Sequence, residues 1–179
     1  LIDLGRGQDR LGGSVLAQVW NALGSISPDV APEDVISFFE LLSELKKREC
    51  LLAYHDRSDG GVLVTALEMA FAGRCGLDID IDVDLQQAAA RLFSEEVGAL
   101  IQVDDKQVSE VMALAAQSGL KGAVSLVGKP RLDERIVVNT RQFELIDSRR
   151  AALQSLWSET SHAIARLRDN AACADAELE

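Results

Sequence analysis

Basic residues are scarce in this sequence. Lysine and arginine together number 18, against 29 aspartates and glutamates, and the formal net charge is −11. A general nucleic-acid binder needs a positively charged face that displaces the counterions of the phosphates, so this deficit argues against a nucleic-acid partner. A site for a single nucleotide is still compatible with the charge, because a few backbone N–H groups and one metal ion can hold a phosphate in an acidic protein.

Cysteine and long apolar runs are also lacking. The cysteines are Cys50, Cys75 and Cys173, and their odd number and wide spacing argue against a disulfide framework or a structural zinc site. No uninterrupted apolar segment approaches the ~20 residues of a membrane span. The opening LIDLGRGQDR has neither the basic nor the long apolar region of a signal peptide. We therefore expect a cytoplasmic protein with no membrane partner. Since the sequence starts without methionine inside an apolar run, we also expect a piece of a longer chain.

What is present is a globular composition, with 47% hydrophobic and 26% charged residues. Short apolar runs typical of strands alternate with segments of helical periodicity. This order predicts an α/β (mixed α+β) domain in which a mixed β-sheet is covered by helices on both faces. Strands are expected at 1–4, 51–54, 77–84, 100–103, 124–127, 136–138 and 143–146, with 124–127 and 136–138 paired. Helices are expected at 15–23 (capped by Ser14), 32–48, 61–73, 86–93, 105–117 and 148–168, and the acidic residues 169–179 are expected to form a frayed linker.

The stretch HDRSDGG, which starts at His55, follows an expected strand and precedes an expected helix. The first N–H groups of a helix are unpaired, and the two glycines leave room for a phosphate to approach them. Ser58 could donate its hydroxyl, and Asp56 or Asp59 could hold Mg²⁺, which prefers oxygen ligands. The alternative is a helix cap, with Ser58 or Asp59 as the N-cap residue and the glycines as a tight turn. The local spacing alone favours the cap.

Other groups give weaker signals. His55 could be a general base, although a histidine at the end of an apolar strand is more often structural. The glycine-rich loop 5–14 matches neither a dinucleotide fingerprint nor a Walker A loop, but it is a candidate for binding an anion. Glu95 and Glu96 could do acid–base work or lie in a solvated turn. No Ser-His-Asp or Cys-His grouping has a recognisable nucleophile context, and we assign no catalytic residue.

Four stretches together resemble one family. LIDLGRGQDRLGGSVLAQV, LLAYHDRSDGGVLVTALEMAFAGRCGLDI, LFSEEVGALIQV and LWSETSHAIARLRDNAACADAE look like the long, single-chain formylglycinamide ribonucleotide amidotransferases (phosphoribosylformylglycinamidine synthases) of bacterial purine synthesis. The resemblance covers essentially the whole chain in order. Its departures are mild: Ser94 stands where asparagine is usual, Val97 where leucine is usual, and Arg74 where histidine is common.

The resemblance implies an ATP-dependent carbon–nitrogen ligase with glutamine as the nitrogen donor. Residues 1–168 would be the C-terminal domain of its second synthetase copy, with the three-layer α-β-α fold of the aminoimidazole ribonucleotide synthetase superfamily. Residues 169–179 would be an acidic linker toward a glutaminase domain. The partners would be that domain and a preceding synthetase N-terminal domain of the same chain. We expect no synthetase activity from the 179 residues by themselves.

The resemblance also implies roles for the motif. Asp56 corresponds to a Mg²⁺ ligand, and Ser58 to a contact with a tightly held auxiliary adenine nucleotide (ATP or ADP). To these we add Asp59, Gly60 and Gly61 as nucleotide contacts, from the physics of the turn. We do not expect the isolated domain to retain the nucleotide. Two alternatives are a purely structural interface module and a related ATP-dependent enzyme, such as a selenophosphate synthetase or a hydrogenase-maturation protein. Without its partner domains the chain would expose apolar surface, and self-association through that surface is a further candidate interaction.

Overall fold

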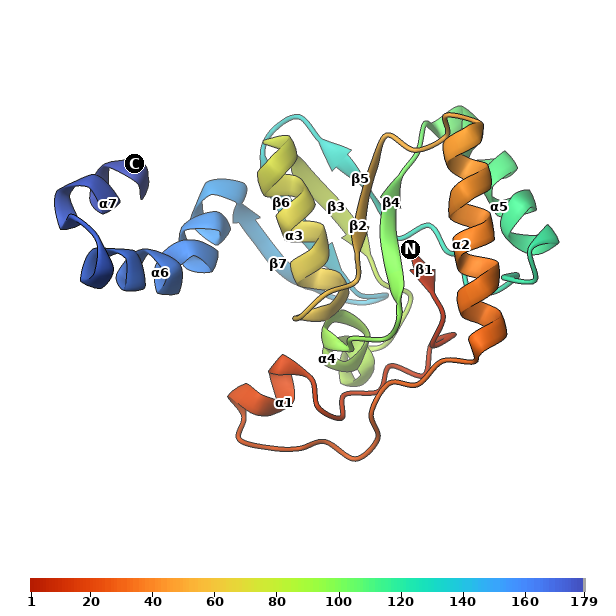
Figure 1. Ribbon diagram of the computed structural model, residues 1–179, viewed down its shortest axis with the longest axis horizontal. Helices are drawn as coiled ribbons and strands as arrows, with labels where there is room; N and C mark the ends of the chain where they lie inside the picture. The colour runs from red at the N-terminus through yellow and green to blue at the C-terminus, as the bar shows by residue number, and fades with distance from the viewer. Residues whose placement is uncertain (179) are drawn as a thin grey trace.

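The computed structural model describes residues 1–178 (Figure 1). Strands and helices interleave along the chain, as the sequence predicts, and three strands follow one another in its C-terminal third. The strands are β1 (Ile2–Asp3), β2 (Ala53–Asp56), β3 (Gly76–Asp80), β4 (Gly98–Gln102), β5 (Gly128–Arg131), β6 (Arg135–Asn139) and β7 (Glu144–Arg149). The helices are α1 (Val15–Val19), α2 (Pro32–Lys47), α3 (Gly61–Gly73), α4 (Leu85–Phe93), the short 3₁₀ helix η1 (Asp105–Gln107), α5 (Val108–Gln117), α6 (Arg150–Arg168) and α7 (Ala171–Leu178).

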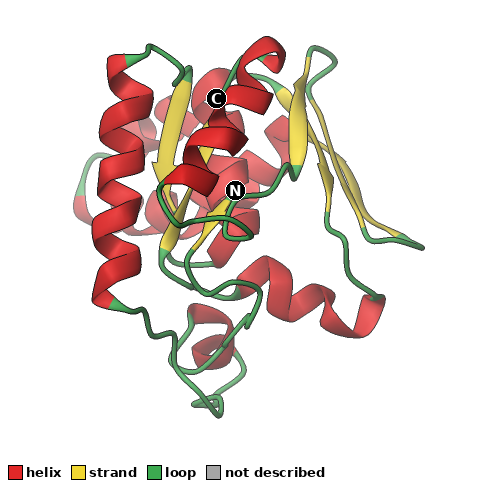
Figure 2. Ribbon diagram, turned by 90° about the vertical axis from the view of Figure 1, so that its right-hand side faces the viewer, coloured by secondary structure: helices red, strands yellow, loops and turns green. Residues whose placement is uncertain are grey.

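The strands form two sheets. Sheet A has the order β1-β4-β2 and is antiparallel throughout, with Ile2 opposite Ala99 and His55 opposite Leu100. Sheet B has the order β5-β3-β6-β7 and is mixed, because β3 and β6 run parallel while the other neighbours are antiparallel. Figure 2 shows the two groups of strands standing apart from each other.

Helices cover both faces of sheet A. On one face α2 and α5 pack over β1 and β4, and their buried side chains include Leu41, Leu45 and Val111. On the other face lie α3 and α4, which share a second core with β3 and β6 of sheet B. The mixed α/β class and the three-layer α-β-α arrangement are thus confirmed, and sheet B packs on the far side of α3 and α4 (Figures 1 and 2).

The starts of α1 and α2 agree with the capping and proline signals in the sequence. The Ser14 side chain accepts a hydrogen bond from Ala17 N–H at 3.2 Å and caps α1, as predicted, although this helix ends at Val19 rather than at residue 23. Helix α2 begins at Pro32 with two acidic residues in its first turn and two lysines in its last, a distribution that complements the helix dipole.

The expected pairing of residues 124–127 with 136–138 is wrong. Val124 makes only an isolated bridge to Ile2, and β6 pairs with β3 and β7 instead. Residues 128–131 (GKPR), which lie between the two expected strands, form the edge strand β5, which pairs with β3. An edge strand tolerates Pro130 because one side of its backbone has no neighbouring strand within the described residues, so the missing N–H of proline breaks no hydrogen bond there.

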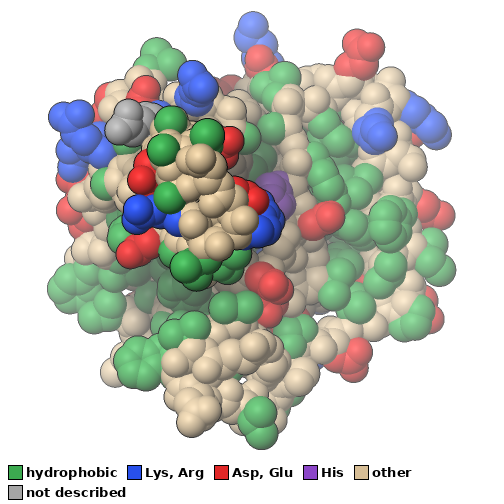
Figure 3. Space-filling view, turned by 60° about the vertical axis from the view of Figure 1, so that its left-hand side comes forward, with side chains coloured by type: hydrophobic (Ala, Val, Ile, Leu, Met, Phe, Trp, Pro, Cys, Tyr) green, Lys and Arg blue, Asp and Glu red, His purple; other side chains and the backbone are tan. Residues whose placement is uncertain are grey.

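The C-terminal segment differs from the expected frayed end. Residues 171–178 form α7, which packs back on α6 and buries Ala174. His162 and Arg166 of α6 both contact the Asp175 carboxylate at 3.0 Å. Figure 3 faces this end of the molecule and shows apolar side chains exposed among charged ones. Within residues 1–178, none of the helices is both long enough and apolar enough to cross a bilayer.

Candidate functional site

The HDRSDGG motif lies where sheet A passes into α3, as predicted. Asp56 is the last residue of β2 and its side chain is exposed. Tyr54 lies on the same side of the strand, since alternate residues point to the same face, and its hydroxyl donates a hydrogen bond to the Asp56 carboxylate. Burial and this hydrogen bond raise the pKa of Tyr54 to about 12. Tyr54 therefore stays protonated and orients the carboxylate of Asp56.

His55 points to the opposite face of sheet A. Its Nδ1 lies 2.7 Å from the Asp56 carbonyl oxygen, and its Nε2 lies 3.2 Å from the Glu68 carboxylate. Glu68 also accepts a hydrogen bond from the Trp157 indole at 3.0 Å. Both ring nitrogens of His55 are thus engaged in joining β2, α3 and α6, which favours the structural interpretation of this residue.

The predicted side-chain cap of α3 is wrong. The N-cap residue is Gly60, whose φ is +81°, and no side chain caps the helix. The Ser58 hydroxyl donates instead to the Asp56 carbonyl at 3.0 Å, and Ser58 N–H donates to the Thr65 hydroxyl at 3.2 Å. Asp59 is exposed and lies outside these contacts. The turn therefore leaves the carboxylate of Asp59 facing solvent.

Both glycines of the motif are required by close packing. A Cβ added at Gly60 would lie 2.4 Å from Val64 Cγ2, and one at Gly61 would lie 2.6 Å from the Leu92 carbonyl oxygen. Their N–H groups are already paired, Gly60 with the Glu95 carboxylate and Gly61 with the Ser58 carbonyl, each at 2.9 Å. The internal structure thus accounts for both glycines, and their contact with a nucleotide stays a prediction.

Sequence reasoning missed the role of Arg57. Its guanidinium is buried and donates to the Asp3 carboxylate at 3.0 Å and to both the carbonyl and the hydroxyl oxygen of Ser94. Asp3 also accepts hydrogen bonds from Gly5 and Gly7 N–H, so it connects the motif to the glycine-rich loop. The available signal was strand alternation, because a residue that follows the exposed Asp56 is expected to point inward.

Three consecutive residues, Ser94 to Glu96, hold the surrounding loops, and we call them the clamp segment. Ser94 accepts from Arg57, as described above. Glu96 is completely buried and accepts from Arg10 through the backbone N–H, Nε and Nη2, at 2.7 to 2.9 Å. Burial acts to raise the pKa of Glu96, but the bonds from Arg10 outweigh it and lower that pKa. A solvated turn is therefore the wrong interpretation of Glu96, and its ion pair withdraws it from acid–base work.

Asp56 is the Mg²⁺ ligand that the resemblance implies, and the side chains around it decide whether it fits that role. Within residues 1–178, no three histidine, cysteine, aspartate or glutamate side chains gather closely enough to hold a metal. Mg²⁺ commonly takes only one or two protein carboxylates and completes its shell with phosphate oxygens and water. An exposed single carboxylate fits a Mg²⁺ site that other ligands complete.

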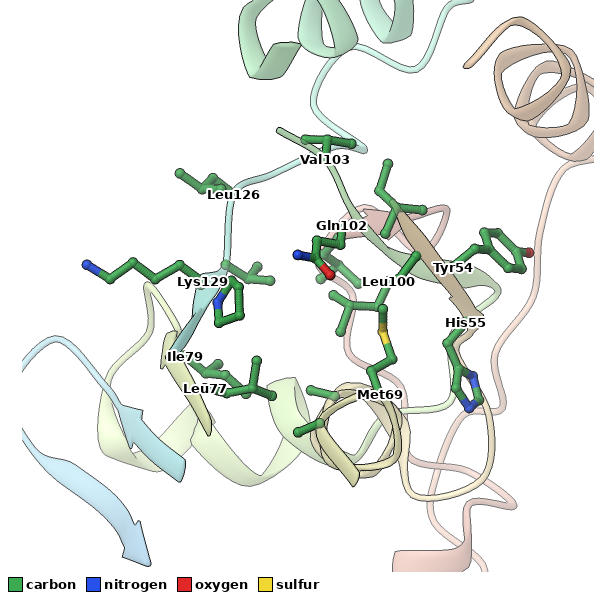
Figure 4. A pocket seen from close by; sticks show the side chains of 18 of the residues that line it. Tyr54, His55, Met69, Leu77, Ile79, Leu100, Gln102, Val103, Leu126 and Lys129 are labelled. Carbon is green, nitrogen blue, oxygen red and sulfur yellow. The ribbon is translucent and has the colours of Figure 1, made fainter. Parts of the chain in front are cut away.

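A separate cavity of about 480 Å³ lies between the two sheets. Figure 4 shows Leu100 and Gln102 of β4 facing Leu77 and Ile79 of β3, with Met69 of α3 below them. Its lining is mostly apolar. Among the described residues of the HDRSDGG motif, only His55 reaches this lining. The cavity and the turn that carries Asp56 are therefore different features.

Comparison with known proteins places the fold. Residues 2–138 match the family model of the AIR synthase related protein, C-terminal domain. Solved structures with a similar fold include T. maritima PurL complexed with ATP, with a TM-score of 0.60 and 18% identity over 70% of this chain and 22% of that chain. T. maritima PurL complexed with FGAR has a TM-score of 0.61 and 18% identity over 83% of this chain and 24% of that chain. E. coli HypE, a hydrogenase maturation protein, is also similar, with a TM-score of 0.53 and 18% identity over 83% of this chain and 45% of that chain. The chain spans less than a quarter of the two PurL chains.

Proposed function

Because this chain belongs to the family of AIR synthase related proteins, as their C-terminal domain, we propose that it is part of a formylglycinamide ribonucleotide amidotransferase. The whole enzyme would convert formylglycinamide ribonucleotide, ATP and glutamine to formylglycinamidine ribonucleotide, ADP, phosphate and glutamate. Two observations support this choice within the family: the four motifs quoted above, and the likeness to PurL structures that hold ATP or FGAR. In this proposal residues 1–168 are the C-terminal domain of the second synthetase copy, and residues 169–179 lead to the glutaminase domain.

The domain contributes half of a Mg²⁺–nucleotide site in this proposal. The observation that carries it is the exposed Asp56 carboxylate, oriented by Tyr54 at the end of β2 and followed by a turn that the buried Arg57 immobilises. Bound Mg²⁺ would neutralise phosphate charge. Asp56 would hold the ion, and the Ser58 hydroxyl would contact the nucleotide. Asp59, Gly60 and Gly61 form the adjoining part of the turn, and the preceding N-terminal domain supplies the remaining ligands.

A structural interface module is the second candidate. It is favoured by the segment around α1, where four large apolar side chains are between 62% and 88% exposed: Val19, Trp20, Leu23 and Ile26. Such a patch is typical of surfaces that contact another domain or protein. A related ATP-dependent enzyme is compatible with the likeness to HypE, which is a likeness of fold.

The substitution Asp56→Ala in the full-length protein tests the proposal. Removal of the carboxylate takes away a Mg²⁺ ligand, so we expect purified protein to carry little adenine nucleotide or Mg²⁺. Because a bound ligand stabilises the state that binds it, the unfolding temperature should also fall. The measurements are the nucleotide released on denaturation, the magnesium content and the thermal midpoint.

Asp105→Ala is the matched control, since Asp105 is an exposed aspartate on η1, away from the motif. It should retain nucleotide and Mg²⁺ at the level of the parent protein. Unchanged nucleotide and Mg²⁺ in Asp56→Ala would instead favour the interface module.

A further inference from the structure

Glu95, the middle residue of the clamp segment, joins two loops that are far apart in the sequence. One oxygen of its carboxylate, Oε1, accepts hydrogen bonds from Val15 N–H and from Gly60 N–H, each at 2.9 Å. Val15 is the first residue of α1, and Gly60 is the N-cap of α3. The glycine-rich loop that ends at Ser14 and the turn of the HDRSDGG motif are therefore attached to the same atom.

The charges around the clamp segment separate Glu95 from its neighbour. Glu96 pairs with Arg10 and is completely buried. Glu95 is half-buried, and across residues 1–178 no lysine, arginine or histidine forms an ion pair with it. Its contacts are the two backbone N–H groups. Because one oxygen accepts both hydrogen bonds, this single carboxylate is a substantial restraint on both loops.

The restraint acts directly on the proposed nucleotide site. Gly60 is buried, so loss of its acceptor would leave a buried N–H unpaired, which is costly. The same turn carries Ser58, whose carbonyl is held by Gly61 N–H and whose hydroxyl is held by the Asp56 carbonyl. A change in the position of Gly60 therefore moves the two residues proposed to contact Mg²⁺ and nucleotide.

We propose that Glu95 is a positioning residue for the Mg²⁺–nucleotide site, because it fixes the HDRSDGG turn against the glycine-rich loop. The proposal rests on the proposed function of Asp56 and Ser58. Glu95 acts through the reach and direction of its oxygen rather than through its charge. Glutamine offers an acceptor oxygen at the same distance from the backbone, whereas aspartate keeps the charge but is one methylene too short to meet both donors.

The experiment compares Glu95→Asp with Glu95→Gln in the full-length protein. Affinity for Mg²⁺–ADP is measured by calorimetry after the retained nucleotide has been removed, and the thermal midpoint is measured without nucleotide. We expect Glu95→Asp to weaken Mg²⁺–ADP binding by about tenfold, and Glu95→Gln to stay within about threefold of the parent. The control is Glu110→Asp, which shortens a glutamate that contacts Arg48 at 2.8 Å away from the turn. It should leave the affinity unchanged.

A variant outside the clamp segment covers the case in which Glu95→Asp does not fold. Val15→Pro removes the N–H donor of Val15 and leaves Glu95 unchanged, at the first position of α1, where proline is tolerated. Ser14 already has the extended conformation that a residue before proline requires, with φ −63° and ψ 157°. We expect this variant to bind Mg²⁺–ADP about threefold more weakly, because the turn is then held without the glycine-rich loop. Unchanged affinity in Val15→Pro overturns the proposal.

The remaining outcomes are equally decisive. Unchanged affinity in Glu95→Asp, even with a lower thermal midpoint, means that Glu95 serves stability alone. Increased affinity means that Glu95 competes with phosphate for Gly60 N–H, and equal losses in both variants mean that the charge is needed as well as the reach. Each of these results overturns the proposal. If Asp56→Ala retains its nucleotide, the proposed function itself fails. If Asp56→Ala loses its nucleotide but Glu95→Asp binds Mg²⁺–ADP as the parent protein does, the failure is confined to this inference.

Discussion

Asp9, in the glycine-rich loop, carries a buried oxygen that lacks a hydrogen-bond partner within residues 1–178. Its φ is +50°, and its Oδ1 is buried with no hydrogen-bond partner among the described residues. Burial raises the pKa of Asp9, although Arg91, whose Nε lies 3.2 Å from the other carboxylate oxygen, acts in the opposite direction. The neighbouring buried acids Asp3 and Glu96 each have a closer arginine partner. Ionised Asp9 is therefore a cost to the folded state at neutral pH.

Asp9→Asn should raise the thermal midpoint at pH 7. A carboxyl whose folded pKa is raised contributes stability below its unfolded pKa, about 3.9, and loses that contribution as the pH rises through the folded pKa. Asparagine removes this loss and tolerates a positive φ as well as aspartate does. The gain over the parent protein should shrink as the pH falls toward 4 and below. Thermal unfolding from pH 3 to 8 measures both effects.

Asp105→Asn serves as the control for that experiment, because its exposed carboxylate should leave the midpoint unchanged. A less stable Asp9→Asn variant at pH 7 would show that the attraction to Arg91 outweighs the cost of burial.

At the scale of elements, the site depends on how closely the start of α3 meets the end of α4. Gly61 has a φ of +68°, and a Cβ there would meet the backbone of Leu92 and Ser94 within 2.7 Å. Gly13, at the end of the glycine-rich loop, has a similar φ of +77° but open space around it. Substitutions at Gly61 and Gly13 therefore share the energetic cost of a left-handed backbone, and only the substitution at Gly61 adds a steric clash.

Gly61→Ala should destabilise the protein far more than Gly13→Ala. A non-glycine residue in the left-handed region costs of order 1–3 kcal/mol, which both variants incur. Gly61→Ala must in addition push α3 away from α4, and we expect its total loss to exceed about 4 kcal/mol. The measurement is the free energy of unfolding in urea. Equal losses in the two variants would mean that the packing between α3 and α4 yields easily.

The same elements show what local sequence can predict. Helix α2 was predictable because proline, acidic residues and basic residues mark its two ends. The strand-to-helix position of HDRSDGG was predictable from the apolar runs that flank it. The pairing of β5 and β6 with β3 was not predictable, because Pro130 is typical of a turn and the partners are distant in sequence. The contact of Gly60 with Glu95 likewise has no local spacing signal.

At the scale of the whole molecule, α6 and α7 extend from the body of the domain (Figure 1). No residue of α6 is fully buried. Trp157 attaches α6 to α3, because its ring lies 5.8 Å from that of Phe71 on α3 and its indole donates to Glu68. The C-terminal helices are thus coupled to α3, the helix that follows the HDRSDGG turn.

Trp157→Ala should release the C-terminal helices while leaving the rest of the domain folded. Loss of the aromatic contact and the hydrogen bond removes about 2–4 kcal/mol of attachment, less than a fully buried tryptophan would. We expect faster amide hydrogen exchange in residues 150–178 and little change in α2 and β4. Leu167→Ala is the control, because Leu167 is 90% exposed. Faster exchange throughout the chain would show instead that the C-terminal helices and the core unfold together.

The pairing of β1 with β4 has a consequence for folding. Ile2 of β1 lies opposite Ala99, so the first strand stays without its partner until residue 99 has left the ribosome. Contacts between such distant residues slow folding, because a long loop must close before they form. The clamp segment is separated from β4 only by Val97, so the same step that pairs β1 also brings the clamp segment to both loops. Any mutation that slows the pairing of β1 with β4 will delay the maturation of the proposed nucleotide site to the same extent.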